Sequence, residues 1–146
     1  MNKDFYTRAE ATAEAIRGHQ TGELVPRVAI VLGTGLGALT DVINVESTIP
    51  YIDLDGFPEP TVETHSGQLI IGTIEGTPVV VMQGRFHRYE GYSLQEVTFP
   101  IRVLSLLKAE TLVVTNVSGG MNPLWGVGEL VLLDDHINLL GDSPLV

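Results

Sequence analysis

The chain has 146 residues, of which 44% are hydrophobic, and carries 18 Asp and Glu against 8 Lys and Arg side chains, a formal net charge of −10. That charge argues against a nucleic-acid partner. No apolar run approaches the ~20 residues of a membrane span. No basic and then apolar leader precedes Asp4, so we also expect no secretory signal. Because there is no cysteine, disulfides and thiolate metal sites are excluded, and the cytoplasm is the default location. The length fits a single domain, 1–146.

The first predicted element is a helix that Asp4 caps and Gly18 ends. Its apolar residues recur at helical spacing: Phe5, Ala9, Ala13 and Ile16. Residues 28–32 then form a short, continuous apolar run, which predicts a buried strand. We expect the helix to be structural, whereas the end of such a strand is a usual place for a ligand in an α/β fold.

This strand runs directly into a glycine-rich loop, residues 33–37. Glycines at alternate positions allow backbone N–H groups to face an anion, and the Thr34 hydroxyl adds another donor. A plain tight turn is an equally open interpretation. A dinucleotide fingerprint of the form G-x-G-x-x-A is a third, and its residues would be Gly33, Gly35 and Ala38, with Asp53 or Asp55 as the ribose acid.

The middle of the chain contains two β runs. Residues 41–49 are compatible with either helix or strand, and 51–63 read as a loop with Gly56, Pro58 and Pro60. His65 follows this loop. A single histidine is more often a structural residue than a site residue, so His65 alone does not indicate a site. Residues 68–74 and 78–82 predict a hairpin that turns across 75–77.

The densest polar chemistry follows this hairpin, in residues 82–93. Arg85 offers a planar fork of donors that suits phosphate, and His87 can donate a hydrogen bond or move a proton. The alternative is that Arg85 and Arg88 are solvated charges that pair with Glu90. Because two other strands also end in small and polar residues, we favour an anion site.

The last third begins with a predicted helix, opened by the capping box Ser93–Glu96 and kinked by Pro100. Its expected inward residues are Leu94, Val97, Ile101, Leu104 and Leu107. Residues 111–115 predict a buried β-branched strand that ends in the polar run 116–120, and 127–133 predict one more strand. Asp134-Asp135-His136 suggests a metal ligand set, but no second cluster is spaced to complete it.

Taken together, these motifs resemble the purine nucleoside phosphorylases, specifically the trimeric class specific for 6-oxopurines. The resemblance is carried by residues 31–37, 65–67, 82–92, 97–100, 115–123 and 135–138. Its most specific part is Gln-Gly-Arg-Phe-His-x-Tyr-Glu-Gly-Tyr at 83–92, supported by Asn-x-x-Gly-Gly-x-Asn-Pro at 116–123. Members of that family are nearly twice this length. The sequence therefore resembles an N-terminal half, and we expect more protein to follow Val146.

The resemblance implies an α/β fold, a three-layer αβα sandwich with a mixed central sheet, here truncated. It implies reversible phosphorolysis of purine (deoxy)ribonucleosides to the free base and (deoxy)ribose 1-phosphate, and a homotrimer at full length. Inorganic phosphate is the co-substrate, and neither a metal nor an organic cofactor is implied. The matched phosphate-binding residues are Thr34, His65, Arg85, His87 and Val117, with His87 also catalytic. The matched nucleoside-binding residues are Tyr89, Val117 and Ser118.

Two positions depart from the family pattern, because alanines are usual at Val117 and Ser118. Val117 can still offer its main-chain N–H to phosphate. The family residues that read the purine and bind the 5′-hydroxyl belong to the second half, so base specificity is not readable here. Three alternatives stay open: a catalytically incomplete fragment that binds phosphate or only assembles, a methylthioadenosine phosphorylase-like enzyme, and a nucleotide-binding Rossmann module.

Overall fold

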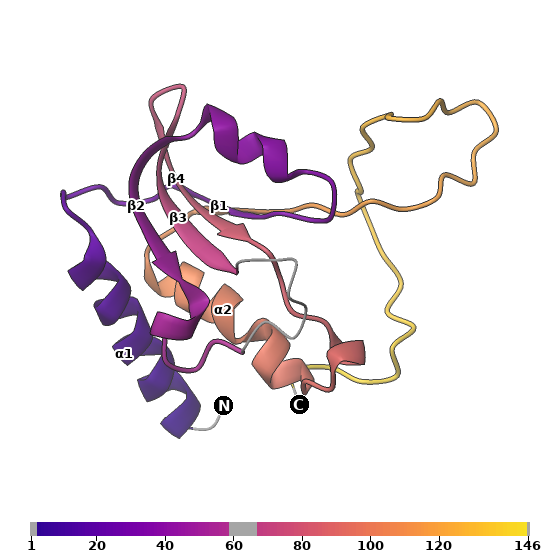
Figure 1. The fold of residues 1–146 in the computed structure, drawn as a ribbon. Coiled ribbons are helices and arrows are strands. Elements are labelled where there is room, and N and C mark those ends of the chain that lie inside the picture. Colours follow the sequence, from indigo (N-terminus) through magenta and orange to yellow (C-terminus); the bar gives the residue numbers. More distant parts are fainter. Residues whose placement is uncertain (1–2, 59–66, 146) are drawn as a thin grey trace.

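The computed structural model describes residues 3–58 and 67–145. Its helices are α1 (Lys3–His19) and α2 (Leu94–Leu106), with the short 3₁₀ turns η1 (Gly37–Val42), η2 (Tyr51–Asp53) and η3 (Arg88–Glu90). Its strands are β1 (Val28–Val31), β2 (Asn44–Pro50), β3 (Gln68–Ile74), β4 (Thr77–Gln83) and β5 (Thr111–Val114). Helices and strands are packed into one body, and the chain beyond β5 leaves it as a wide loop (Figure 1).

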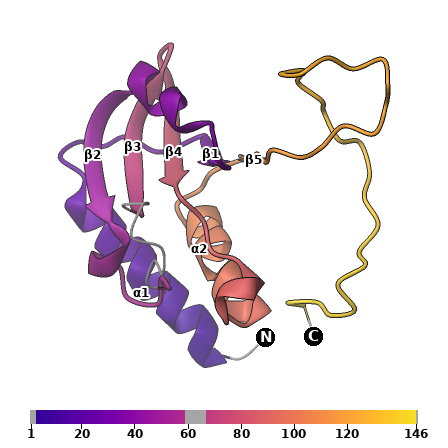
Figure 2. The ribbon, with the colours of Figure 1, turned by 45° about the vertical axis from the view of Figure 1, so that its right-hand side comes forward.

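The strands form one mixed sheet in the order β2-β3-β4-β1-β5 (Figure 2). Strand β1 pairs in parallel with both β4 and β5, whereas β3 pairs antiparallel with β2 and β4. The predicted α/β class and mixed sheet are thereby confirmed. Because β4, β1 and β5 run the same way, their carboxyl ends meet at one edge of the sheet.

Alternate residues of the strands serve two apolar clusters, as the period of a strand requires. On one face, α1 and α2 pack together against the sheet (Figure 1), and buried residues of this cluster include Ala13, Ile16, Val31, Leu69, Val80, Met82, Phe99 and Val103. On the other face, Leu36 and Leu39 pack from the η1 region against a cluster that includes Ile30, Ile70 and Val81. Both faces of the central strands are therefore covered.

Local signals explain most boundaries. The predicted hairpin is confirmed: its turn is Glu75-Gly76, with φ values of 47° and 79°, and two positive φ angles match the twist of the flanking strands. The ambiguous run 41–49 resolves into the end of η1 and most of β2. Helix α1 continues through Gly18 to His19, where His19 Nδ1 lies 2.9 Å from the Ala15 carbonyl oxygen.

The capping box of α2 is confirmed, since Glu96 N–H donates to Ser93 Oγ and Ser93 N–H donates to Glu96 Oε2, at 3.2 and 2.8 Å. Its inward face agrees with the predicted one in part. Leu104 and Leu107 are buried as predicted, but Leu94, Val97 and Ile101 are only half-buried, and Phe99 and Val103, which the prediction left out, are fully buried. The helix packs against both α1 and the sheet, so a single apolar stripe does not describe it.

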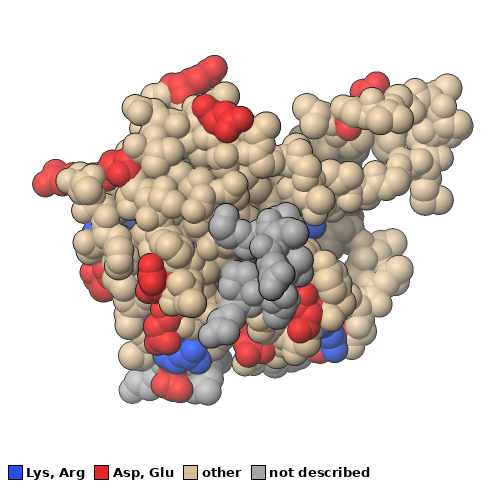
Figure 3. All heavy atoms as spheres, in the orientation of Figure 1, with Lys and Arg blue, Asp and Glu red and all other residues tan. Residues whose placement is uncertain are grey.

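Two predictions for the last third are wrong in this structure. Strand β5 forms at the edge of the sheet, but all four of its residues are exposed rather than buried, because neither apolar cluster includes a residue of β5. Residues 127–133 form no strand and are exposed, since a strand needs a neighbour for its backbone hydrogen bonds. On the face in Figure 3, acidic side chains are spread over the body, and the loop beyond β5 is mostly uncharged.

Within residues 3–58 and 67–145, no helix is both long and apolar enough to cross a membrane.

Candidate functional site

Three loops leave the parallel strands at the same edge of the sheet. Gly33 follows β1, Gly84 follows β4, and Thr115 follows β5. The loops are joined directly: Gly33 N–H donates to Thr115 Oγ1 at 2.8 Å, and that hydroxyl donates to the Val31 carbonyl at 3.0 Å. Thr115 therefore fixes the start of the glycine-rich loop against the end of β5.

The glycine-rich loop lies so close to the β5 end that Gly33 has no room for a side chain. An ideal Cβ on Gly33 would lie 2.6 Å from the Thr115 carbonyl oxygen and 2.9 Å from Asn116 Cα. Gly35 has a φ of +83°, and an ideal Cβ there would lie 4.0 Å from Val117 Cγ2. The structure thus brings Val117 next to the loop that carries Thr34.

Arg85 connects the ends of β4 and β5. Its Nη1 donates to the Thr115 carbonyl oxygen at 2.7 Å, and its Nε donates to His87 Nε2 at 3.1 Å. The side chain is half-buried, and β1 lies between the two strands that it connects. Its guanidinium is therefore held beside the glycine-rich loop, which ends β1.

His87 is held by partners on both ring nitrogens. Arginine can only donate, so Nε2 accepts from Arg85, and Nδ1 carries the proton and donates to Glu90 Oε1 at 2.6 Å. Glu90 Oε1 also accepts from His87 N–H at 2.9 Å, and the Glu90 side chain is only 10% exposed. The ring of Tyr89 stacks on the imidazole with a centroid distance of 4.6 Å, and Tyr89 is 83% exposed.

Among the described residues, Glu90 forms no ion pair with Arg85 or Arg88, so the alternative in which both arginines pair with Glu90 is wrong. The Glu90 carboxylate faces His87, and Arg88 pairs with Asp142 at 3.1 Å instead. Glu90 and Thr115 are thus site residues that the sequence interpretation missed. The His-x-x-Glu spacing is the one available signal for Glu90, because it is the spacing of a capping box.

The other predicted site residues are less closely engaged. Thr34 and Ser118 are exposed, and their side chains make no hydrogen bond to another described residue. His65 lies outside the described residues. The site that the structure assembles is therefore Arg85, His87 and Tyr89 together with the backbone of the Gly33 and Val117 loops.

The dinucleotide-fingerprint alternative is not supported by the topology. That fingerprint needs a helix after the glycine loop and then a parallel strand. Here β1 is followed by the 3₁₀ turn η1 and by β2, which pairs antiparallel with β3. The glycines of this loop therefore do not open a βαβ unit.

The remaining candidate sites lie elsewhere. No group of three or more His, Asp or Glu side chains in the described part of the chain could hold a metal, and Asp135 Oδ1 accepts from His136 N–H at 2.7 Å.

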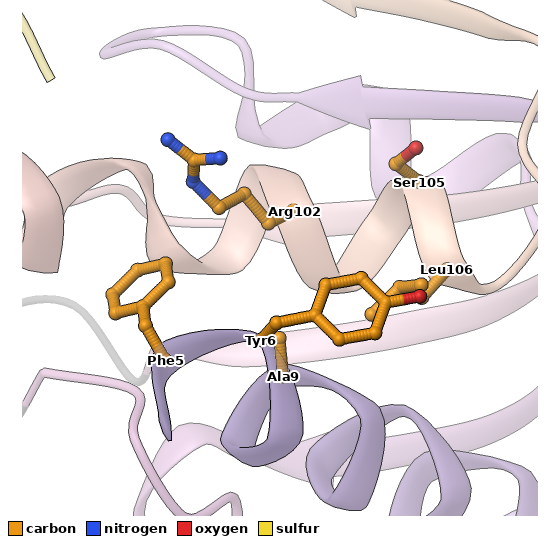
Figure 4. Close-up of a pocket in the computed structure, with 6 residues that line it drawn as sticks. All are labelled: Phe5, Tyr6, Ala9, Arg102, Ser105 and Leu106. Atoms are coloured by element: carbon orange, nitrogen blue, oxygen red, sulfur yellow. The ribbon is translucent and has the colours of Figure 1, made fainter. Parts of the chain in front are cut away.

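A shallow cavity of about 200 Å³ lies between α1 and α2 (Figure 4). Its lining includes Phe5, Tyr6 and Arg102, and it shares no residue with the loops at the strand ends.

A guanidinium, an imidazole and glycine-rich backbone at the carboxyl edge of parallel strands are the groups with which α/β proteins bind phosphate. The fold defines the chain as an α/β protein, and its loops bring such groups together at that edge. Residues 27–146 match the model of the phosphorylase superfamily, and the chain belongs to that family.

Individual relatives show which members of the family this chain is similar to. The chain is 52% identical over 121 residues to purine nucleoside phosphorylase 1 of Geobacillus stearothermophilus, covering 83% of this chain and 44% of the relative. It is 47% identical over 149 residues to the purine nucleoside phosphorylase of Rattus norvegicus, covering 99% and 51%. The predicted resemblance to purine nucleoside phosphorylases is confirmed, and the chain spans about half the length of these relatives.

A solved structure gives the same result for the fold. The crystal structure of a purine nucleoside phosphorylase in complex with ribose 1-phosphate superposes with a TM-score of 0.77 at 45% identity. The match covers 84% of this chain and 44% of that one. The predicted phosphorylase-type α/β fold, present here in part, is confirmed.

Proposed function

We propose that the protein containing this chain catalyses the reversible phosphorolysis of purine (deoxy)ribonucleosides to the free base and (deoxy)ribose 1-phosphate. The single observation that carries the proposal is Arg85, which bridges the ends of β4 and β5 through Thr115 beside the Gly33 loop. The relatives named above are purine nucleoside phosphorylases, and one of them is seen with ribose 1-phosphate.

In this proposal the chain supplies the phosphate and sugar side of the site. Phosphate is bound by Arg85, His87, the Thr34 hydroxyl and the Val117 N–H, with His65 contributing from outside the described residues. Arg85 gives a forked, charge-assisted contact. His87 adds a donor when its Nε2 leaves Arg85 Nε and takes up a proton from solvent, because Nε2 is an acceptor while the ring proton is on Nδ1. Tyr89 contacts the sugar from its exposed position next to His87, and Val117 and Ser118 complete the proposed nucleoside contacts.

These groups suit the charges of the reaction. Cleavage of the glycosidic bond passes through an oxocarbenium-like state in which positive charge grows on the sugar. A phosphate oxygen forms the new bond to the anomeric carbon, while the bond to the purine nitrogen breaks and its electron pair leaves with the base. A held, anionic phosphate stabilises the growing charge and is already in position to attack. His87 is the catalytic residue of this half because it holds and orients that phosphate.

We propose further properties for the whole protein. Inorganic phosphate is a co-substrate, and no metal or organic cofactor is required. The full-length protein is a cytoplasmic homotrimer, and groups outside this chain bind the purine. A second candidate is an incomplete fragment that binds phosphate without turnover, which the roughly half-length match to relatives favours.

The test is phosphate-dependent release of hypoxanthine from inosine by the 146-residue chain, with its elution volume recorded alongside. Phosphate-dependent release supports the enzyme proposal directly. Thermal stabilisation by phosphate without release supports the phosphate-binding fragment. Absence of both would remove the proposed role of the Arg85 loop. Tyr89→Phe adds a check on the sugar assignment, since it should weaken nucleoside binding more than phosphate binding.

A further inference from the structure

We infer that Tyr51 is a positioning residue that sets the backbone of the Arg85–His87 loop for phosphate, an inference that rests on the proposed function. Tyr51 opens η2, directly after β2, and is 1% exposed. Its hydroxyl donates to the Gly84 carbonyl oxygen at 2.9 Å. Gly84 immediately precedes Arg85, so a residue from outside the parallel strands contacts the start of the loop.

The ring and backbone of Tyr51 make further contacts around the same loop. Its ring lies against Phe86 with a centroid distance of 5.3 Å and against Phe57 at 5.2 Å. Its N–H donates to the Gly67 carbonyl oxygen at 2.9 Å. Phe86 is buried between the half-exposed Arg85 and His87. Tyr51 therefore contacts the residue before Arg85 and the residue after it, and neither of those residues carries the polar chemistry.

The loop needs such a contact because its first residue has an unusual backbone. Gly84 has a φ of +99°, a conformation that residues with a side chain rarely adopt. A glycine also has many alternative conformations, so something must select this one. The hydroxyl bond to its carbonyl does so, and burial raises the pKa of the Tyr51 phenol, so the hydroxyl remains a donor throughout the working pH range.

Losing the hydroxyl should weaken phosphate binding without removing any phosphate ligand. The Gly84 carbonyl would lose its partner, and the guanidinium of Arg85 would no longer be pre-set for the anion. One neutral hydrogen bond corresponds to roughly a three- to tenfold change in affinity. Nucleoside contacts made through Tyr89 should change less, because η3 begins beyond the packed Phe86 ring.

The experiment compares Tyr51→Phe with the wild-type 146-residue chain in titrations with inorganic phosphate, followed by calorimetry, and in thermal unfolding without phosphate. Tyr6→Phe is the matched control, because Tyr6 lies on α1, is 40% exposed and lines the cavity between α1 and α2 instead of the loop. We expect the dissociation constant for phosphate to rise three- to tenfold in Tyr51→Phe only. A lower melting temperature with an unchanged dissociation constant would show a purely structural tyrosine and overturn the inference.

A second variant approaches the same hydrogen bond from the loop. Gly84→Ala leaves Tyr51 intact, and its Cβ would have ordinary contacts, 3.7 Å from Gly67 Cα and 4.0 Å from Tyr51 Cε2. Only the positive φ is disturbed, so phosphate binding should weaken here too, and unchanged binding would contradict the inference even if Tyr51→Phe does not fold. If the wild-type chain does not bind phosphate, the proposed function is contradicted, and so is the inference that rests on it.

Discussion

Arg85 Nε donates to His87 Nε2 across 3.1 Å, so the two side chains assigned to one anion also bind each other. The same arginine donates to the Thr115 carbonyl at 2.7 Å. A guanidinium has five N–H donors and these two contacts use two of them, so Arg85 can bind phosphate through its remaining N–H groups while both contacts persist. The contacts hold both side chains near the positions that an incoming anion would need.

The first prediction concerns the tautomer of His87. Without phosphate, the neutral imidazole of His87 should carry its proton on Nδ1, because Nε2 accepts from Arg85 and Nδ1 faces Glu90. Nitrogen chemical shifts of the imidazole measure this directly. Glu90→Ala should give a mixture of tautomers, whereas Glu90→Gln keeps an acceptor oxygen and should preserve the Nδ1–H form. A wild-type protein with the proton on Nε2 would contradict the arrangement.

The second prediction is that Arg85→Ala weakens phosphate binding roughly ten- to hundredfold, the range that corresponds to one hydrogen bond to a charged group. Phosphate titration by calorimetry measures the effect. Arg88→Ala is the control, because Arg88 is three residues away, half-exposed and paired with Asp142. Equal losses in the two variants would mean that only the overall positive charge matters, and that Arg85 has no special geometry.

The third prediction concerns the glycine-rich loop. Gly33→Ala should destabilise the fold by about 1–3 kcal/mol, as overpacking does, because its Cβ would lie 2.6 Å from the Thr115 carbonyl. Gly37→Ala is the matched control in the same loop, since nothing lies within 4 Å of its Cβ. Denaturant unfolding of both variants measures the difference. Similar stability for the two would show that the loops are not in close contact.

Local patterns predicted much of this fold. The hairpin, the capping box and the β1 strand each depend on residues within a few positions of one another, so the sequence alone is sufficient to find them. The candidate site was predictable in outline for the same reason, because Arg85 and His87 share one short loop.

The predictions that were wrong concern features that depend on residues distant in sequence. The β-branched run of β5 predicts a strand, but it does not show whether other elements pack on that strand. In the structure the residues of β5 are exposed. Residues 127–133 have strand composition and no partner in the described structure. Thr115 could not be predicted as a site residue, because its hydroxyl reaches Gly33 only through the parallel pairing of β1 and β5.

The last prediction is a pH dependence of stability at the start of α2. The Ser93 hydroxyl, which donates to Glu96 Oε2 at 2.7 Å, and then the Ser93 backbone N–H hold the pKa of Glu96 below its ordinary value. A carboxyl whose pKa is lower in the folded state stabilises the fold when it is ionised. That contribution should therefore be complete above the ordinary glutamate pKa of about 4.3 and should disappear as the pH falls through the lower folded value.

Denaturant unfolding at pH 7 and at about pH 3, on either side of the ordinary glutamate pKa, tests this sign. Glu96→Gln should lower the free energy of unfolding at neutral pH and remove part of the loss on acidification. Ser93→Ala should cost about 1 kcal/mol at neutral pH, as the loss of an N-cap does. Glu23→Gln, at an exposed side chain, is the control and should leave the wild-type acid dependence intact. If Glu96→Gln keeps the full acid dependence as well, the capping carboxylate does not contribute to it, and other carboxyl groups must account for the acid sensitivity of the fold.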